Sequence, residues 1–477
     1  MQRKLTVYLL VCAMLAALTA CGESQPSGTD TTDSDTSTTP VETSEFVPAN
    51  VKYGGVDFVI AENDVGDWMQ SAFITEQNGE VLNDSIYERN RIVEELYDVN
   101  IKGSKIEGYR SDQNLSQIKN SVLAGDKEFD IAYIPGLLTS KLFTEPDFLV
   151  PLSDIDSIDL SHSWWAQGSV EAMTFFGKTV SATGDMIVST DGSATVTFFN
   201  KTLADQFNID VYDVVRQGKF TFDWVYQTGQ LAQSDLNGDT KIDTADDRFG
   251  FIVESLNLIH MISAAGEKLA RTNQNGEPEL TINSKVIDIA QRYVEVINDT
   301  DAVISVQDYR IKSGGPASVF NPGRAFFWIT NLQRMNAARS FEVDFGMVPF
   351  PKWEESDEYI APMNGYWDSW LMVPATNDEL DRTGNIVEAL GYYSKELVTP
   401  AFIETSVTTK ALRDDESAEM LQMVLPKMSF DAGLYFDWGY SQFIQIATKH
   451  TSDVVSLIDS ERPAIEASIA DFIKAFK

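Results

Sequence analysis

One short stretch of the chain spaces oxygen-bearing side chains as a calcium ligand set. In DLNGDTKIDTAD, such side chains stand at positions one, three, five, nine and twelve: Asp235, Asn237, Asp239, Asp243 and Asp246. At the seventh position, Lys241 would contribute its backbone carbonyl. Ca²⁺ takes about six to eight oxygen ligands, and this spacing wraps a loop around one ion. The segment therefore predicts a structural Ca²⁺ site.

Two departures from the pattern of EF-hand and dockerin loops weaken this prediction. Position six is Thr240, where such loops have glycine, although Gly238 lies nearby. Position twelve is Asp246, whose side chain is shorter than that of glutamate; Asp247 is a possible substitute. A dockerin needs two such loops, and only one is present. The alternative is an acidic surface turn that binds no metal.

No arrangement of side chains predicts catalysis. The three histidines, His162, His260 and His450, are scattered, and the sequence contains no HExxH, G-x-S-x-G or P-loop motif. Two carboxylates suffice for glycoside hydrolysis, but in a chain with 72 acidic residues such pairs carry no information. We therefore expect a protein that is not an enzyme.

The N-terminal residues 1–21 form a targeting segment. Arg3 and Lys4 precede an apolar run that ends in Leu18-Thr19-Ala20-Cys21, a lipobox whose cysteine accepts a lipid. The other cysteine, Cys12, lies within the removed segment, so the mature domain would have no disulfide. The prediction is an extracytoplasmic protein that its acyl chains anchor to the cell membrane. An ordinary secretory signal is the alternative.

The composition of the chain predicts a tether before the folded part and limits its possible partners. Residues 22–48 are rich in Ser, Thr and acidic residues and predict a disordered tether. The formal net charge of −36 excludes nucleic acid as a natural partner, because such a surface repels phosphates. No later run is apolar enough to cross a membrane, and we expect a monomer.

The elements after the tether alternate between strand and helix. VDFVIAEN (56–63) and VNIKGSKI (99–106) predict strands, and so does FDIAYI (129–134). Between them, NDSIYERNRIVEELYDVNI predicts a helix that Asn83 or Asp84 caps, and NLSQIKNSVLAG predicts one that ends at Gly125. This order implies parallel βαβ units, with ligands beyond the carboxyl ends of the strands.

The order of segments over the whole folded part resembles the extracellular solute-binding proteins of ABC transporters, in the family that binds sugars and oligosaccharides. The segments that carry this resemblance are NDSIYERNRIVEELYDVNI, WW at 164–165, TGD at 183–185, FFNKTLADQFNI, the calcium loop with RFGF, GRAFFWITN, DFGMVPFPK and ALRDDESAEML. It implies an α/β, two-lobed periplasmic-binding-protein-like fold, with a ligand cleft between lobes that crossing strands join. Lobe 1 would comprise 49–190 and 365–425, and lobe 2 would comprise 191–364 and 426–477.

The resemblance also implies a function and a site. The protein would capture a carbohydrate in the cleft and deliver it to the transmembrane subunits of an ABC permease. Sugars need planar polar side chains and aromatic plates. The expected ligand-binding residues are Trp68, Tyr133, Asp185, Trp328, Trp367, Asp368 and Trp438. For Trp164 and Trp165, a structural role and contact with the cleft both stay open.

Two other functions stay open at this point. The fold class also contains binders of other small molecules, so the ligand need not be a sugar. A glycan adhesin or sensor would bind sugar without transport.

Overall fold

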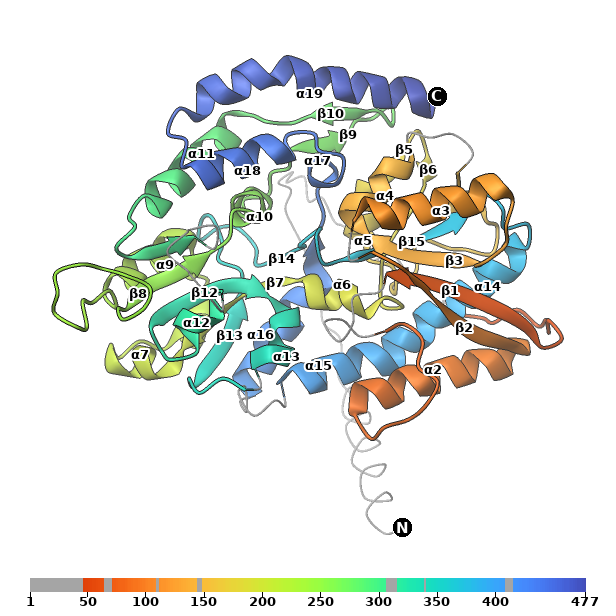
Figure 1. The fold of residues 1–477 in the computed structure, drawn as a ribbon, viewed down its shortest axis with the longest axis horizontal. Helices are drawn as coiled ribbons and strands as arrows, with labels where there is room; N and C mark the ends of the chain where they lie inside the picture. The colour runs from red at the N-terminus through yellow and green to blue at the C-terminus, as the bar shows by residue number, and fades with distance from the viewer. Residues whose placement is uncertain are drawn as a thin grey trace, which may run out of the picture. The chain divides into compact units, whose positions relative to one another are not determined.

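The computed structural model describes residues 46–63, 71–108, 111–143, 148–305, 315–338, 340–407 and 415–477. The N-terminal segment, the lipobox and almost all of the predicted tether lie outside these residues. The chain from Thr43 to Lys477 is a single compact unit. Its described strands form two five-stranded sheets and three two-stranded ones, and the two large sheets are described in turn (Figure 1).

The first sheet has the strand order β2-β1-β3-β15-β4. β1 is parallel to β2 and to β3, and β15 is antiparallel to its neighbours. The bounds are β1 (Val56–Asn63), β2 (Val99–Ile106), β3 (Ile131–Pro135), β4 (Leu149–Val150) and β15 (Ser369–Pro374). The strands predicted at 56–63 and 99–106, and the parallel βαβ connection, are confirmed.

Helices cover both faces of this sheet. α2 (Val81–Tyr97) packs with α14 (Leu380–Tyr393), and α3 (Asp112–Ala124) packs with α4 (Gly136–Phe143). Phe58 and Ile60 of β1 belong to the core that contains Val93 of α2, whereas Ala61 belongs to the core of α3. Both faces of β1 are therefore buried, which explains why its sequence is mostly apolar.

The helix ends test the capping predictions. α3 ends before Gly125, which has φ of +72° and a backbone N–H bonded to the last turn, as predicted. The predicted cap of α2 is wrong: this helix begins earlier, at Val81, so Asn83 and Asp84 lie inside it. The Asp84 carboxylate instead accepts the backbone N–H of Asn78 and Gly79, and it thereby holds the preceding turn.

The second sheet has the order β11-β8-β12-β7-β13. β8 is parallel to β11 and β12, and β7 is antiparallel to β12 and β13. The bounds are β7 (Thr195–Asn200), β8 (Phe249–Val253), β11 (Val303–Ser305), β12 (Ala325–Asn331) and β13 (Phe345–Pro349). Its helices include α9 (Phe222–Gln230), α10 (Asn257–Ala264), α11 (Ser284–Ile297) and α16 (Asp415–Val424).

Three described segments connect the two sheets. The first carries the short helix α6 (Val188–Ser193), and the others carry β14 (Ala361–Pro362) and β16 (Met428–Ser429), which pair in parallel. Ala182 pairs with Leu371 near the first sheet, and Ala194 pairs with Met363 near the second. The first two crossing segments therefore run side by side, as Figure 1 shows around α6 and β14.

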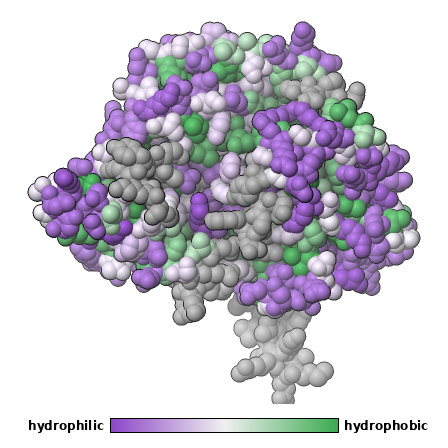
Figure 2. All heavy atoms as spheres, viewed as in Figure 1, coloured by the Kyte–Doolittle hydropathy of each residue, from purple (hydrophilic) through white to green (hydrophobic). Residues whose placement is uncertain are grey.

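The C-terminal helices follow the third crossing. They are α17 (Ala432–Tyr435), α18 (Tyr440–Lys449) and α19 (Val454–Phe476), and α18 and α19 pack on α11. The predicted lobe boundaries stay a prediction. None of the described helices combines the length and the apolar character that a bilayer-crossing helix needs. Hydrophilic residues dominate the face in Figure 2, and apolar ones form smaller patches.

Candidate ligand sites

Polar side chains lie at the carboxyl ends of the parallel strands in both sheets. In the first sheet, Asn63 ends β1, and Ser369 of β15 pairs with Pro135 at the end of β3. Trp367 and Asp368 directly precede β15, so both lie at this edge. In an open parallel sheet this edge is where ligands bind.

Glu62 at this edge is already engaged. Its carboxylate accepts the Ala72 backbone N–H at 2.8 Å and the Ser71 hydroxyl, and it pairs with Lys105 at 3.1 Å. These bonds fix Ser71 and Ala72 beside the end of β1. Glu62 therefore has a positioning role.

The corresponding edge of the second sheet carries an acid and a base. Glu254 follows β8 directly, and Arg334 lies just beyond β12. Burial raises the pKa of Glu254, and the positive charge of Arg334 opposes that rise. Neither residue was predicted as a site residue. The position of Glu254 directly after the apolar strand FGFIV was the signal that could have identified it.

Neighbouring groups at this edge have unused hydrogen-bonding capacity. Thr195 of β7 pairs in register with Asn331 of β12. Within the described part of the chain, no partner reaches the hydroxyls of Thr195 and Thr330 or the side-chain oxygen of Asn331, all of which are buried. Buried polar atoms usually have partners, so these mark a place where water or a ligand would satisfy them.

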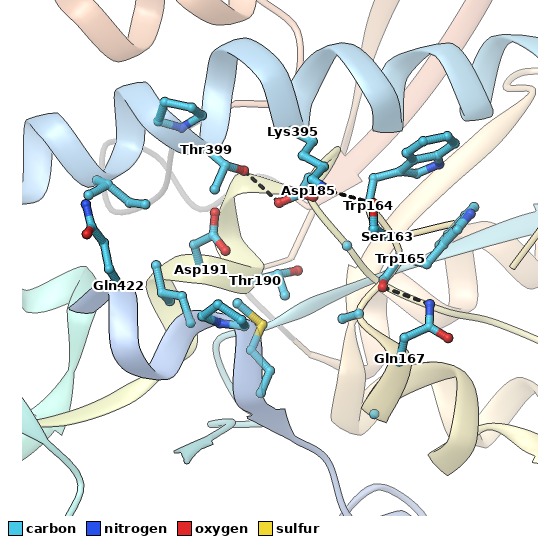
Figure 3. A pocket seen from close by; sticks show the side chains of 18 of the residues that line it. Ser163, Trp164, Trp165, Gln167, Asp185, Thr190, Asp191, Lys395, Thr399 and Gln422 are labelled. Atoms are coloured by element: carbon cyan, nitrogen blue, oxygen red, sulfur yellow. Dashed lines mark hydrogen bonds between the residues drawn. The ribbon is translucent and has the colours of Figure 1, made fainter. Parts of the chain in front are cut away.

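A separate cavity of about 930 Å³ lies beside the first crossing segment (Figure 3). One side is formed by residues 163–168 and by Gly184 and Asp185. The opposite side comes from α15 (Thr399–Val407) and α16. Thr190 and Asp191 of α6 contribute buried side chains.

Local backbone geometry shapes the cavity wall. A Cβ atom on Gly184 would lie 2.1 Å from the Trp164 carbonyl oxygen, so only glycine permits this close approach. Across the cavity, α14 continues into a π-helical turn (Ser394–Val398) that leads into α15. Lys395 of this turn and Thr399, the first residue of α15, both line the cavity. Such π-turns often occur at functional sites.

Asp185 is the predicted site residue that lines this cavity. The Thr399 hydroxyl donates a hydrogen bond of 2.7 Å to its carboxylate (Figure 3). Burial raises the pKa of Asp185 to about 6, although the Thr399 bond and the charge of Lys395 oppose this rise. The carboxylate of Asp191, which sequence reasoning missed, has a pKa well above its usual range because of burial and the charge of Asp185.

The tryptophans at 164 and 165 contribute backbone to the cavity rather than stacking plates. Figure 3 shows both rings directed away from its centre. The Trp165 indole donates to Glu388 at 2.9 Å, and the Trp164 ring stacks on His162. Their side chains therefore have structural roles.

The other predicted ligand residues lie apart from this cavity. Trp68 lies outside the described residues. Trp367 is half-buried beside Tyr366, and Asp368 is buried and accepts a hydrogen bond from the Tyr435 hydroxyl. These two share the first-sheet edge with the end of β3. Tyr133 lies on β3 itself, but its side chain is buried in the core of the first sheet.

Trp328 and Trp438 lie in apolar cores. Trp328 is 1% exposed, and its ring contacts those of Phe198 and Phe320. Trp438 is also 1% exposed, and it stacks on Phe436 at a centroid distance of 4.6 Å. This burial argues against both rings as stacking plates in this conformation.

The predicted calcium loop forms a series of tight turns. Thr240 has φ of +69°, the left-handed conformation for which such loops use glycine. The Asp235 carboxylate accepts the backbone N–H of Gly238 and Thr240, and both oxygens of buried Asp247 accept backbone N–H groups. Among the residues with described positions, no three acidic, histidine or cysteine side chains converge as a metal site.

Comparisons with known proteins identify the fold. No protein-family model matches the sequence, and neither does any curated protein. Among solved structures, a cyclic α-maltosyl-1,6-maltose-binding protein from Arthrobacter globiformis has a TM-score of 0.57 at 15% identity, over 87% of this chain and 99% of that chain.

Two further structures give similar values. A sugar transporter from Rhizobium etli in an open conformation has a TM-score of 0.54 at 12% identity, over 88% of this chain and 99% of the other. An ABC substrate-binding protein from Listeria monocytogenes in complex with cycloalternan has a TM-score of 0.53 at 12% identity, over 87% and 99%. The predicted two-lobed, periplasmic-binding-protein-like α/β fold is therefore confirmed.

Proposed function

We propose that the chain is the solute-binding lipoprotein of an ABC importer and that it binds a sugar or oligosaccharide in the cleft between its lobes. The observation that carries the proposal is the likeness of fold over 87% of the chain to proteins that bind cyclic oligosaccharides. Both of those proteins are described as binding proteins, which supports binding without catalysis.

The chemistry of the strand ends supports a carbohydrate. A sugar presents hydroxyl groups, which need charged or amide side chains, and an apolar face, which stacks on aromatic rings. Glu254, Arg334, Asn331 and Asn63 provide the first kind of group at the two sheet edges, and half-buried Trp367 provides the second. In the proposed mechanism, ligand that bridges both edges stabilises the closed state, which then docks on the permease.

The proposed location is the outer face of the cell membrane. Lipid on Cys21 would anchor the chain there, and residues 22–48 would be the tether that lets the folded part reach both solute and permease. Replacing Cys21 by serine should move the protein from the membrane fraction to the soluble fraction. Membrane retention of this variant would contradict the anchor.

The test of the ligand is thermal unfolding against a panel of mono- and oligosaccharides, with amino acids and peptides as controls. Ligand at 100 times its Kd adds about 2.7 kcal/mol, which raises the melting temperature visibly. A shift with one class of sugar would support the proposal. A shift with peptides or amino acids alone would reject the carbohydrate. Turnover of a bound oligosaccharide would replace the binding function by glycoside hydrolysis.

Transport is tested separately, because a glycan adhesin or sensor would also give a sugar shift. Cells that lack the chain should lose uptake of the radiolabelled sugar identified by the panel. Unchanged uptake would leave adhesion or sensing as the role.

We also propose that a Ca²⁺ ion stabilises the loop from Asp235 to Asp246. The donor set consists of oxygen atoms, as Ca²⁺ prefers, and the left-handed backbone at Thr240 gives the required turn despite the absence of glycine. Because the carboxylates do not converge in threes, binding would require some of them to rotate. Calcium at about 1 mM should raise the melting temperature of the wild type but not of Asp235→Ala. An equal rise in both would exclude this loop as the site.

A further inference from the structure

Asp191 in the cavity beside α6 has a buried carboxyl group that is unpaired among the described residues. Its side chain is only 5% exposed, and no donor in the described part of the chain reaches its carboxylate. Figure 3 shows this carboxylate directed into the space that Thr190, Thr399 and Gln422 border. Removing an ionised carboxylate from water is costly unless a cation or several donors pair with it. Among the described residues, Asp191 therefore has no positive partner.

The other charged residues around the cavity do not supply that partner. Asp185 and Glu404 are acidic, and among the described residues that line the cavity only Lys395 is basic. The Lys395 ammonium donates to the Ser163 hydroxyl on the exposed rim, and its charge acts on Asp185. Lining charges therefore sum to a negative value, which favours a cationic ligand.

The remaining wall is apolar and suits an organic body. Ile403, Leu425 and Met428 line the cavity beside the two prolines Pro400 and Pro426, and Gln422 lies exposed at its rim. A volume of about 930 Å³ lies within the range of small-molecule sites, roughly 300–1,000 Å³. An ammonium group on an apolar chain satisfies both the acidic and the apolar parts of this lining.

We propose that this cavity is a second binding site, for an organic cation, with the ammonium head between Asp191 and Asp185 and the apolar body against Ile403, Leu425 and Met428. The described residues hold no cluster of three metal-ligating side chains, so an inorganic divalent cation fits less well. The site lies apart from the polar strand ends to which carbohydrate binding is assigned, and it does not depend on that function.

Calorimetry on the full chain tests the proposal with three probes of equal length: hexylamine, 1-hexanol and hexanoic acid. At pH 7.5, we expect hexylamine to bind at least tenfold more tightly than the alcohol, and the acid not to bind. Asp191→Asn keeps the size but removes the charge, and it should weaken hexylamine at least tenfold. Asp288→Asn, on the exposed face of α11, is the matched control and should leave the affinity unchanged.

A pH series on the wild type gives a second measurement that needs no variant. Hexylamine stays protonated between pH 5 and 8, whereas Asp185 and Asp191 take up protons as the pH falls through their raised pKa values. Hexylamine affinity should therefore fall towards pH 5, and Asp185→Asn should make this fall smaller. Lys395 and exposed Glu404 are the other charged side chains among the described residues that line the cavity.

Three results would overturn the organic-cation site: equal affinity for hexylamine and hexanol, unchanged affinity in Asp191→Asn, or affinity independent of pH. Asp191→Asn should melt no lower than the wild type, because it removes an unpaired buried charge. If this variant fails to fold, the probe comparison and the pH series on the wild type still test whether the cavity binds an organic cation. The carbohydrate panel, repeated on Asp191→Asn, should be unchanged, so failure of either proposal can be recognised separately.

Discussion

Replacing Trp328 by alanine distinguishes a core residue from a stacking plate. The indole is 1% exposed, and the rings of Phe198, Phe320 and Phe341 lie around it at centroid distances of 5.9, 5.6 and 6.3 Å. Truncation of such a side chain leaves a cavity that its neighbours fill only in part. The expected loss in free energy of unfolding is about 3–5 kcal/mol. If Trp328 stacked on the sugar instead, the affinity would fall at least tenfold, which is about 1.4 kcal/mol.

The assay is urea unfolding of Trp328→Ala together with calorimetry against the carbohydrate that shifts the melting temperature most. We expect a large loss of stability and an affinity close to that of the wild type. Trp328→Phe is the control: it retains an aromatic ring, and the indole N–H that it removes has no partner among the described residues. Its loss of stability should be clearly smaller.

Trp367→Ala should show the opposite pattern. This ring is half-buried beside Tyr366 at the first-sheet edge, so its removal should cost little stability but weaken the sugar at least tenfold. The reasoning from burial is refuted if Trp328→Ala is as stable as the wild type and binds sugar at least tenfold more weakly. That result would mean that Trp328 is uncovered in the ligand-binding conformation.

Three other predictions concern buried polar groups. Burial raises the pKa of Asp185 from 3.8 to about 6, so the contribution of Asp185 to the free energy of unfolding is most favourable below pH 3.8 and declines as the pH rises through 6. This decline amounts to at most about 3 kcal/mol. Asp185→Asn should remove it, which melting curves at pH 4 and 7.5 would show. Arg89→Met should cost about 3–5 kcal/mol in urea unfolding, because the guanidinium bonds to backbone carbonyls of two separate segments, and a near-neutral effect would contradict this role. Glu388→Ala should cost about 1–3 kcal/mol, because the Trp165 indole N–H loses its acceptor, whereas Glu388→Gln, which retains an acceptor oxygen, should cost less.

The first sheet could be predicted from the sequence because its signals are local. The predicted bounds of β1 and β2 match the structure, since each is a short β-rich run between turn residues. The end of α3 at Gly125 also follows from one residue, because the left-handed cap strongly favours glycine. The start of α2 could not be predicted in the same way, since Glu80 makes no side-chain cap and Asp84 bonds backwards to the turn.

The location of the site residues depends on information that the sequence does not contain. AFFWITN is buried along its whole length and begins with five apolar residues, because both faces of the central strand β12 are covered. Nothing in this pattern tells whether Trp328 faces a core or a cleft. Asp191 likewise lies in STDGS, a segment without periodicity, and only the fold brings it into a cavity with α15 and α16.

Buried carboxylates gather on the segments that cross between the sheets, and they differ in how well they are paired. Asp431 accepts backbone N–H groups from Leu269 and Gly433 at 2.8 Å, Asp368 accepts the Tyr435 hydroxyl, and Asp185 accepts that of Thr399. Asp191 has no such donor in the described residues. The stability of the apolar sheet cores depends little on nearby charges. The stability of the crossing segments, in contrast, depends on the solvation and protonation of their carboxyl groups. A cation at Asp191 would therefore act where the lobes join, at the position from which a ligand most directly changes the balance between open and closed states.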